Sequence, residues 1–135
     1  MKAISLDLGD RWIGVAISDP LGIIARPYET VEAKQLHRFL KNLFEQETIG
    51  TIVVGYPKTM RGTESAQTKK AVAQAEELKK SFPNHEWILW DERLTSQEAE
   101  RIGRSSSSKE KLLSHARAAA IILTAYLASL ASEHD

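Results

Sequence analysis

Acidic residues that follow two apolar, β-type runs are the side chains best suited to hold a metal ion. Asp7 comes near the end of the run at residues 4–8, and Asp91 and Glu92 directly follow the run at residues 87–90. Carboxylate oxygens are the ligands that hard divalent cations prefer. Because successive side chains of a strand point to opposite faces of its sheet, we expect only one of Asp91 and Glu92 to share a site with Asp7.

These acidic residues also have a purely structural explanation. An aspartate at the end of a strand often stabilises a turn, and Asp7 precedes the turn-forming pair Gly9-Asp10. The residues alone leave both roles open for Asp7. Arg93 follows the second acidic pair, and its guanidinium can bind a carboxylate or a phosphate through two hydrogen bonds. We predict that Arg93 positions an acid or a substrate phosphate.

A possible phosphate-binding connection begins at Gly55 and reaches Thr63 at the expected start of a helix. Free backbone N–H groups and a hydroxyl at a helix N-terminus can bind a phosphate group. Any strand-to-helix connection has a similar composition, however, and from the residues alone this plainer explanation is favoured.

His115 lies on the last predicted helix, on the same face as Ala119, Ile122 and Tyr126. A lone histidine on an apolar helix face is more often a packed core residue than a metal ligand. The residues around it therefore favour a structural role.

Four consecutive serines at residues 105–108 offer little side-chain volume for packing. We expect this stretch to form a mobile surface loop. Positive charge flanks it, carried by Arg104, Lys109 and Lys111. We predict that these three residues contribute to nucleic-acid binding, although most other basic residues in this half of the chain belong to solvated helix faces.

The elements that must position these residues follow from hydrophobic periodicity and turn signals. Three short strands come first, and strands then alternate with helices. We predict strands over 4–8, 12–18, 23–28, 51–55 and 86–90, and helices over 33–47, 64–81, about 95–103 and about 107–132.

This order predicts an α/β fold with a mixed five-stranded sheet covered by helices on both faces. In such sheets the functional site usually lies beyond the carboxyl ends of the parallel strands. We therefore expect Asp7, the connection at residues 55–63 and the segment at residues 91–93 to lie near one edge of the sheet.

Length and composition limit the class of protein. The 135 residues suit a single domain spanning 1–135, and the absence of cysteine excludes disulfide scaffolds, zinc–thiolate sites and thiol nucleophiles. A net charge of zero means that a nucleic-acid partner must be held by a local patch. The longest apolar run, residues 118–131, is too short to span a bilayer. We therefore expect a buried helix there, and a soluble cytoplasmic protein without a membrane partner.

Four segments taken together resemble the bacterial YqgF family, also called RuvX. They are residues 4–19, residues 52–64, residues 91–95 and residues 118–127, which occur in the family's order over nearly the whole chain. The resemblance implies an RNase H-like fold and metal-dependent hydrolysis of phosphodiester bonds. The family includes pre-16S rRNA nucleases and proteins similar to Holliday junction resolvases.

The resemblance also implies the catalytic and metal-binding residues Asp7, Glu92 and His115. The family usually has aspartate where this chain has His115, so one negative charge is lost. An imidazole ligand suits Mn²⁺ better than Mg²⁺, and we expect Mn²⁺ to be the favoured ion. Because related RuvC-type resolvases sometimes carry histidine at the equivalent place, the substitution is compatible with activity.

Three functions are compatible with these observations. The first is a nuclease that processes the 5′ end of structured pre-16S rRNA. The second is a resolvase of branched DNA, which needs two active sites and therefore a homodimer, whereas the first function also suits a monomer. The third is a non-enzymatic nucleic-acid-binding module, silenced by the loss of the third acid. A fourth reading, a nucleotide-binding ATPase-like module, needs a second domain for which 135 residues leave no room.

Overall fold

The computed structural model describes residues 1–56, 66–91 and 108–133, with the side chains of residues 112–131 in the last segment. Its centre is a five-stranded mixed sheet with the strand order β3-β2-β1-β4-β5. The elements are β1 (Lys2–Asp7), β2 (Trp12–Ser18), β3 (Ala25–Glu32), η1 (Ala33–Gln35), α1 (Leu36–Gln46), β4 (Ile49–Tyr56), α2 (Ala66–Ser81), β5 (Glu86–Asp91) and α4 (Ser108–Glu133). The predicted mixed sheet is confirmed, while the helix expected near residues 95–103 lies outside the described residues.

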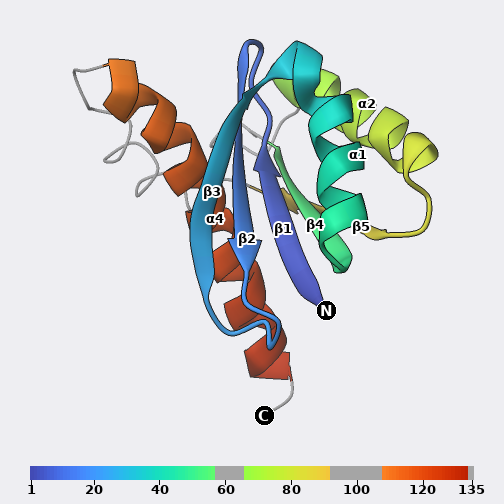
Figure 1. Ribbon diagram of the computed structural model, residues 1–135, viewed down its shortest axis with the longest axis vertical. Coiled ribbons are helices and arrows are strands. Elements are labelled where there is room, and N and C mark those ends of the chain that lie inside the picture. Colours follow the sequence, from blue (N-terminus) through green and yellow to red (C-terminus); the bar gives the residue numbers. More distant parts are fainter. Residues whose placement is uncertain (57–65, 92–107, 134–135) are drawn as a thin grey trace.

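Helices cover both faces of the sheet, as expected (Figure 1). Helices α1 and α2 lie on one face, and α4 lies on the other face, mainly against β1, β2 and β3. The first three strands form an antiparallel meander, and β4 and β5 are parallel to β1 and to each other. The carboxyl ends of the three parallel strands therefore meet at one edge.

Side chains of β1 point alternately into two hydrophobic cores, one on each face of the sheet. Ile4 and Leu6 are fully buried in the core under α1 and α2. Ala3 belongs to the core under α4, which also contains Ala119 and Leu123. Odd-numbered residues of β1 therefore point toward α4, and even-numbered residues point toward α1 and α2.

Strand β3 differs from its predicted bounds of 23–28, because it begins at Ala25 and continues to Glu32. The Asp19 carboxylate accepts hydrogen bonds from the backbone N–H groups of Ile23 and Ile24, at 2.7 and 2.9 Å, which holds these two residues in the preceding loop. Most of β3 is exposed at the edge of the sheet, so its sequence lacks the apolar alternation that predicts a strand.

Helix α1 begins later than its predicted start at residue 33. It starts at Leu36, after a 3-10 turn over Ala33–Gln35. On α2, the buried residues are Thr68, Ala71, Ala75 and Leu78, and Val72 is half-buried.

Helix α4 is the most apolar of the described α-helices. The segment Leu112–Ala131 has the length and hydropathy of a membrane span, with a mean hydropathy of 1.3, and 44% of its most apolar stretch is buried. A core helix of a folded domain has the same properties, and here Ala119, Ile122 and Leu123 are almost completely buried against the sheet. The structure therefore agrees with the predicted buried helix.

Candidate active site

Asp7 ends β1 at the edge where the parallel strands terminate. Its register partners are Gly14 on β2 and Gly55 on β4. The sequence-based expectation that Asp7 and the start of the connection after Gly55 lie at one edge is therefore confirmed. Asp7 is half-buried, in contrast to its fully buried neighbours Ser5 and Leu6.

The Asp7 side chain points to the α4 face of the sheet. Alternate residues of a strand point to the same face, so Asp7 points to the same side of the sheet as Ala3 and Ser5. Ala3 packs in the core under α4. The buried hydroxyl of Ser5 donates a 2.5 Å hydrogen bond to the carbonyl oxygen of Ala119 on α4. This bond fixes the level at which the helix crosses β1.

His115 lies at the same level as Asp7. From Ser5 to Asp7, β1 rises by about 6.6 Å toward its carboxyl end. From Ala119 back to His115, α4 rises by roughly 6 Å. The helix runs antiparallel to β1, so these two steps lead to the same level (Figure 1). Side chains of a helix lean toward its N-terminus, which directs the imidazole toward the Asp7 edge.

A close approach between Gly14 and α4 holds His115 in this position. A β-carbon built on Gly14 would lie only 1.9 Å from the carbonyl oxygen of His115 and 2.9 Å from the backbone nitrogen of Ala116. Only glycine permits this contact. Since Gly14 is the register partner of Asp7, it brings the helix backbone next to the strand that carries the acid.

His115 is half-buried. Its neighbours on the same helix face, Ala119, Ile122 and Tyr126, are buried, as the sequence predicted. His115 is therefore at the N-terminal end of this row of buried residues, where the helix leaves the core and reaches the carboxyl ends of the strands. The position suits a ligand as well as a packed residue.

The other predicted site residues are outside the part of the chain whose side chains are described. They are Glu92, Arg93, Thr63, Arg104, Lys109 and Lys111. Strand β5 ends at Asp91, directly before Glu92. Within the described residues, no group of three acidic or histidine side chains could hold a metal ion. Asp7 and His115 are the two members of the predicted cluster whose side chains are described, and their segments lie at the same level on the α4 face of the sheet.

Two residues near the site were not singled out from the sequence. Gly14 interrupts an apolar strand, and a glycine at such a position often marks a close backbone approach, so the signal was present. Trp12 begins β2 on the same face as Gly14 and is half-buried. Its aromatic side chain looked like an ordinary strand residue.

The sheet order and the helix positions define an RNase H-like fold. Thermus thermophilus RuvC in complex with a Holliday junction substrate has this fold, with a TM-score of 0.60 and 14% identity over 97% of this chain and 96% of that chain. The family described as "RuvX: Holliday junction resolvase" matches residues 1–129. The chain belongs to the RuvX family, which confirms the resemblance seen in the sequence.

Relatives with higher identity carry one shared name. A protein of Dictyoglomus turgidum is 41% identical over 136 residues, covering 96% of each chain, and is named "Putative pre-16S rRNA nuclease". A protein of Rubrobacter xylanophilus with the same name is 37% identical over 114 residues, covering 82% of each chain.

Proposed function

We propose that this protein is a metal-dependent nuclease that hydrolyses phosphodiester bonds of structured RNA and processes the 5′ end of pre-16S rRNA in the cytoplasm. The observation that supports the proposal is that Asp7 ends β1 in register with Gly14, which the backbone of α4 approaches closely at His115. The names of the relatives in the RuvX family support the RNA substrate.

Asp7, Glu92 and His115 are proposed as the metal ligands and the catalytic residues. Trp90 packs on the α4 side of β5, with its ring 6.0 Å from that of Tyr126. Asp91 follows on the opposite side, so we propose the next residue, Glu92, as the acid on the side of Asp7. The acid that shares the site with Asp7 is then Glu92.

The donor atoms fit a divalent cation. A half-buried carboxylate and a half-buried imidazole on one face offer oxygen and nitrogen, and a substrate phosphate supplies further oxygen ligands. Asp7, Glu92 and His115 would hold the ions, which would supply activation of a water molecule and stabilisation of the leaving oxygen of an in-line displacement. Mn²⁺ is the favoured ion, because it accepts imidazole more readily than Mg²⁺ does.

The chain's other residues would hold the substrate. We propose that Arg93 positions either the neighbouring acid or a phosphate group. The remaining contacts to the RNA backbone are assigned to the connection after β4 and to the basic residues around the serine stretch. These residues are Gly55, Thr63, Arg104, Lys109 and Lys111.

A second candidate function is the resolution of branched DNA. The description of the matching family and the Holliday junction in the RuvC complex favour it. Symmetric resolution needs two active sites, so this function requires a homodimer, whereas RNA processing can be carried out by a monomer.

Cleavage assays on two substrates test the proposal. A pre-16S rRNA fragment and a four-way DNA junction are each incubated with the parent and with Asp7→Asn in Mn²⁺. Asp10→Asn is the matched control, because Asp10 lies three residues away and its exposed side chain binds Lys70 instead, at 2.8 Å. We expect RNA cleavage by the parent and the control and none by Asp7→Asn. Cleavage of the junction alone would favour the resolvase, and binding without any cleavage would favour a non-enzymatic module.

A further inference from the structure

Trp12 lies at the rim of the proposed active site. It precedes Gly14 by two residues on β2 and therefore points to the same face of the sheet. Gly9, two residues beyond Asp7, touches the Trp12 backbone so closely that a β-carbon on Gly9 would lie 2.5 Å from the Trp12 carbonyl oxygen. Trp12 is thus beside the chain that leaves Asp7, just past the end of β1.

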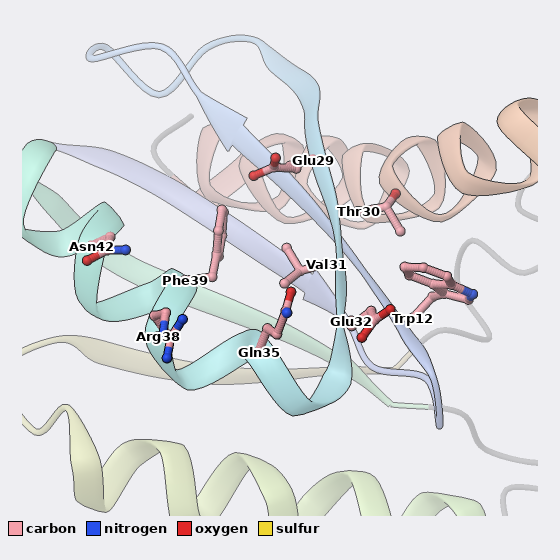
Figure 2. Close-up of a pocket in the computed structure, with 9 residues that line it drawn as sticks. All are labelled: Trp12, Glu29, Thr30, Val31, Glu32, Gln35, Arg38, Phe39 and Asn42. Atoms are coloured by element: carbon pink, nitrogen blue, oxygen red, sulfur yellow. The ribbon is translucent and has the colours of Figure 1, made fainter.

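The Trp12 ring is backed by a positive charge and borders an open cavity. The guanidinium carbon of the exposed Arg11 lies 5.3 Å from the centroid of the ring. The cavity has a volume of about 400 Å³ and extends along the outer edge of β3. Figure 2 shows the indole next to Thr30 on one side of β3, while Phe39 and Gln35 lie on the other side.

Helix α4 also reaches this corner. The Thr30 hydroxyl donates a hydrogen bond to the carbonyl oxygen of Leu112, three residues before His115. Thr30 is in turn the register partner of Gly14. The Trp12 ring therefore belongs to the same corner of the fold as Asp7 and His115, one strand away from the acid.

The charge next to the indole favours a base over a phosphate. Glu29 and Glu32 line the cavity, and carboxylates repel a phosphate group. Arg38, which also lines the cavity, lies on α1, on the other side of β3 from the indole (Figure 2). Lys34 neutralises part of this charge by its contact with Glu32, at 3.5 Å. Carboxylate oxygens accept hydrogen bonds from the exocyclic amino groups of bases. A flat aromatic surface beside acceptors of this kind suits a nucleobase, with the phosphates on the side of Arg11 and Asp7.

We propose that Trp12, backed by Arg11, stacks on an unpaired nucleobase of the substrate next to the phosphate that is cleaved. The inference rests on the proposed nuclease function and deepens it, because it requires a single-stranded nucleotide at the cleavage position. Paired bases in a duplex keep their faces stacked on each other and offer no free face to the indole.

A binding experiment without cleavage separates this inference from the proposed function. The protein carrying Asp7→Asn is titrated, in Mn²⁺, with a short single-stranded RNA that contains 2-aminopurine and with a duplex of the same sequence. Trp12→Ala, Trp12→Phe and Arg11→Ala are each added to this background. The matched control is Tyr28→Ala, because Tyr28 is another partly exposed aromatic residue with an arginine, Arg26, 5.8 Å from its ring.

Stacking on one aromatic side chain should change single-strand affinity by about tenfold to a hundredfold. We expect that loss for Trp12→Ala, together with loss of 2-aminopurine quenching, a smaller loss for Arg11→Ala and near-parent binding for Trp12→Phe. Duplex affinity and the Tyr28→Ala variant should change less than about twofold, which is far below the stacking effect.

Four results would overturn the inference. They are unchanged single-strand affinity in Trp12→Ala, an equal loss for duplex and single strand, an equal loss in Tyr28→Ala, or no binding of either RNA by the Asp7→Asn protein. If Trp12→Ala fails to fold, Trp12→Phe and Arg11→Ala keep the test informative. Loss of single-strand affinity in Trp12→Phe as complete as in an unfolded protein would count against stacking. Failure of cleavage by the parent would refute the nuclease function but would leave these binding results interpretable.

Discussion

Replacing Gly14 with alanine should move α4 away from the strand that pairs with Asp7. The added β-carbon would lie 1.9 Å from the His115 carbonyl oxygen, whereas ordinary van der Waals contacts begin at 3.4 Å. The difference between these two distances, about 1.5 Å, is the displacement that the contact requires. The backbone of β2 fixes the β-carbon and the oxygen belongs to the backbone of α4, so no side-chain rotation can relieve the clash.

The displacement should lower both stability and activity. Overpacking of a close-packed interior costs about 1–3 kcal/mol in the free energy of unfolding. A misplacement of about 1 Å at a catalytic centre can reduce the rate by a hundredfold. We therefore expect Gly14→Ala to stay folded but to cleave RNA about a hundredfold more slowly than the parent.

Urea unfolding and a cleavage assay measure the two effects. Gly50→Ala is the matched control, because its β-carbon would meet the flexible Met1 side chain, with the sulfur at 3.0 Å, and that side chain can move aside. The control should behave like the parent in both assays. Unchanged unfolding and unchanged cleavage in Gly14→Ala would refute the close approach of α4 and with it the placement of His115.

Three further perturbations test other parts of the structure. Ser5→Ala removes a buried hydrogen bond to α4 and should lower the free energy of unfolding by about 1 kcal/mol in urea denaturation. The hydrogen bond from the Ile24 N–H lowers the pKa of Asp19 below its usual 3.8. Partial burial acts against this shift, and hydrogen bonds from other backbone N–H groups add to it. The ionised Asp19 therefore stabilises the fold above pH 3.8 and loses this effect as the pH falls through its lowered pKa, so the difference in urea midpoint between the parent and Asp19→Ala should shrink in acid and should not grow. Neutralising the three cations around the serine stretch should reduce the salt dependence of RNA binding by about 0.7 in slope for each lost phosphate contact, and an unchanged slope would identify them as solvated residues. These cations are Arg104, Lys109 and Lys111.

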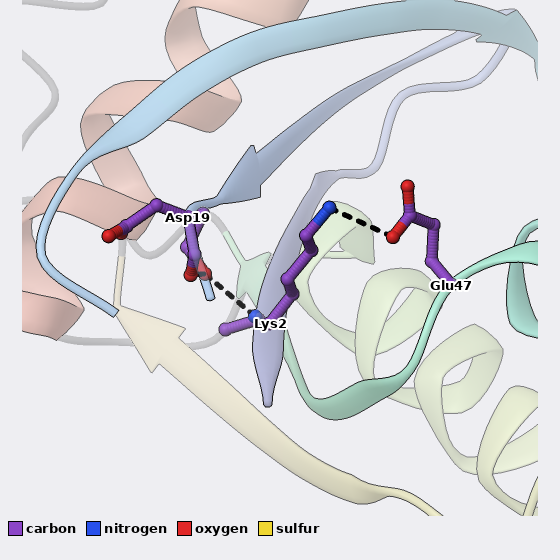
Figure 3. Close-up of polar contacts among 5 residues, drawn as sticks. Lys2, Asp19 and Glu47 are labelled. Atoms are coloured by element: carbon purple, nitrogen blue, oxygen red, sulfur yellow. Dashed lines mark hydrogen bonds and ion pairs between the residues drawn. The ribbon is translucent and has the colours of Figure 1, made fainter. Parts of the chain in front are cut away.

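The ion pair between Lys2 and Glu47 is not expected to affect the proposed active site. It joins the start of β1 to the end of α1 at 2.8 Å (Figure 3). It lies at the opposite end of β1 from Asp7, and both side chains are partly exposed. Pairs of this kind contribute little to stability.

The order of the elements and the mixed sheet could be predicted because buried strands and helices show clear apolar periodicity. The bounds of β3 could not be predicted from periodicity, because that strand is exposed at the sheet edge and its start is fixed by hydrogen bonds from Ile23 and Ile24 to Asp19. Side-chain-to-backbone hydrogen bonds within a loop leave no periodic signal in the sequence.

The site could be predicted in part. The position of Asp7 follows from strand order alone, because parallel strands end at one edge. The position of His115 depends on the level at which α4 crosses the sheet, and that level is fixed by the Ser5–Ala119 hydrogen bond and by the missing side chain of Gly14. Both are contacts between segments about 100 residues apart or more, so only the family resemblance pointed to His115 before the structure did.

The most direct test of the account is the metal dependence of RNA cleavage in three proteins: the parent, His115→Asp and His115→Ala. The structure places His115 level with Asp7, and we propose that it is a ligand of the same ion. The parent should be weakly active in Mg²⁺ and clearly more active in Mn²⁺, and His115→Asp should gain activity in Mg²⁺. His115→Ala should lose about tenfold to a hundredfold of the Mn²⁺ rate. An Mn²⁺ rate of His115→Ala equal to that of the parent would contradict the account and make the histidine a packing residue.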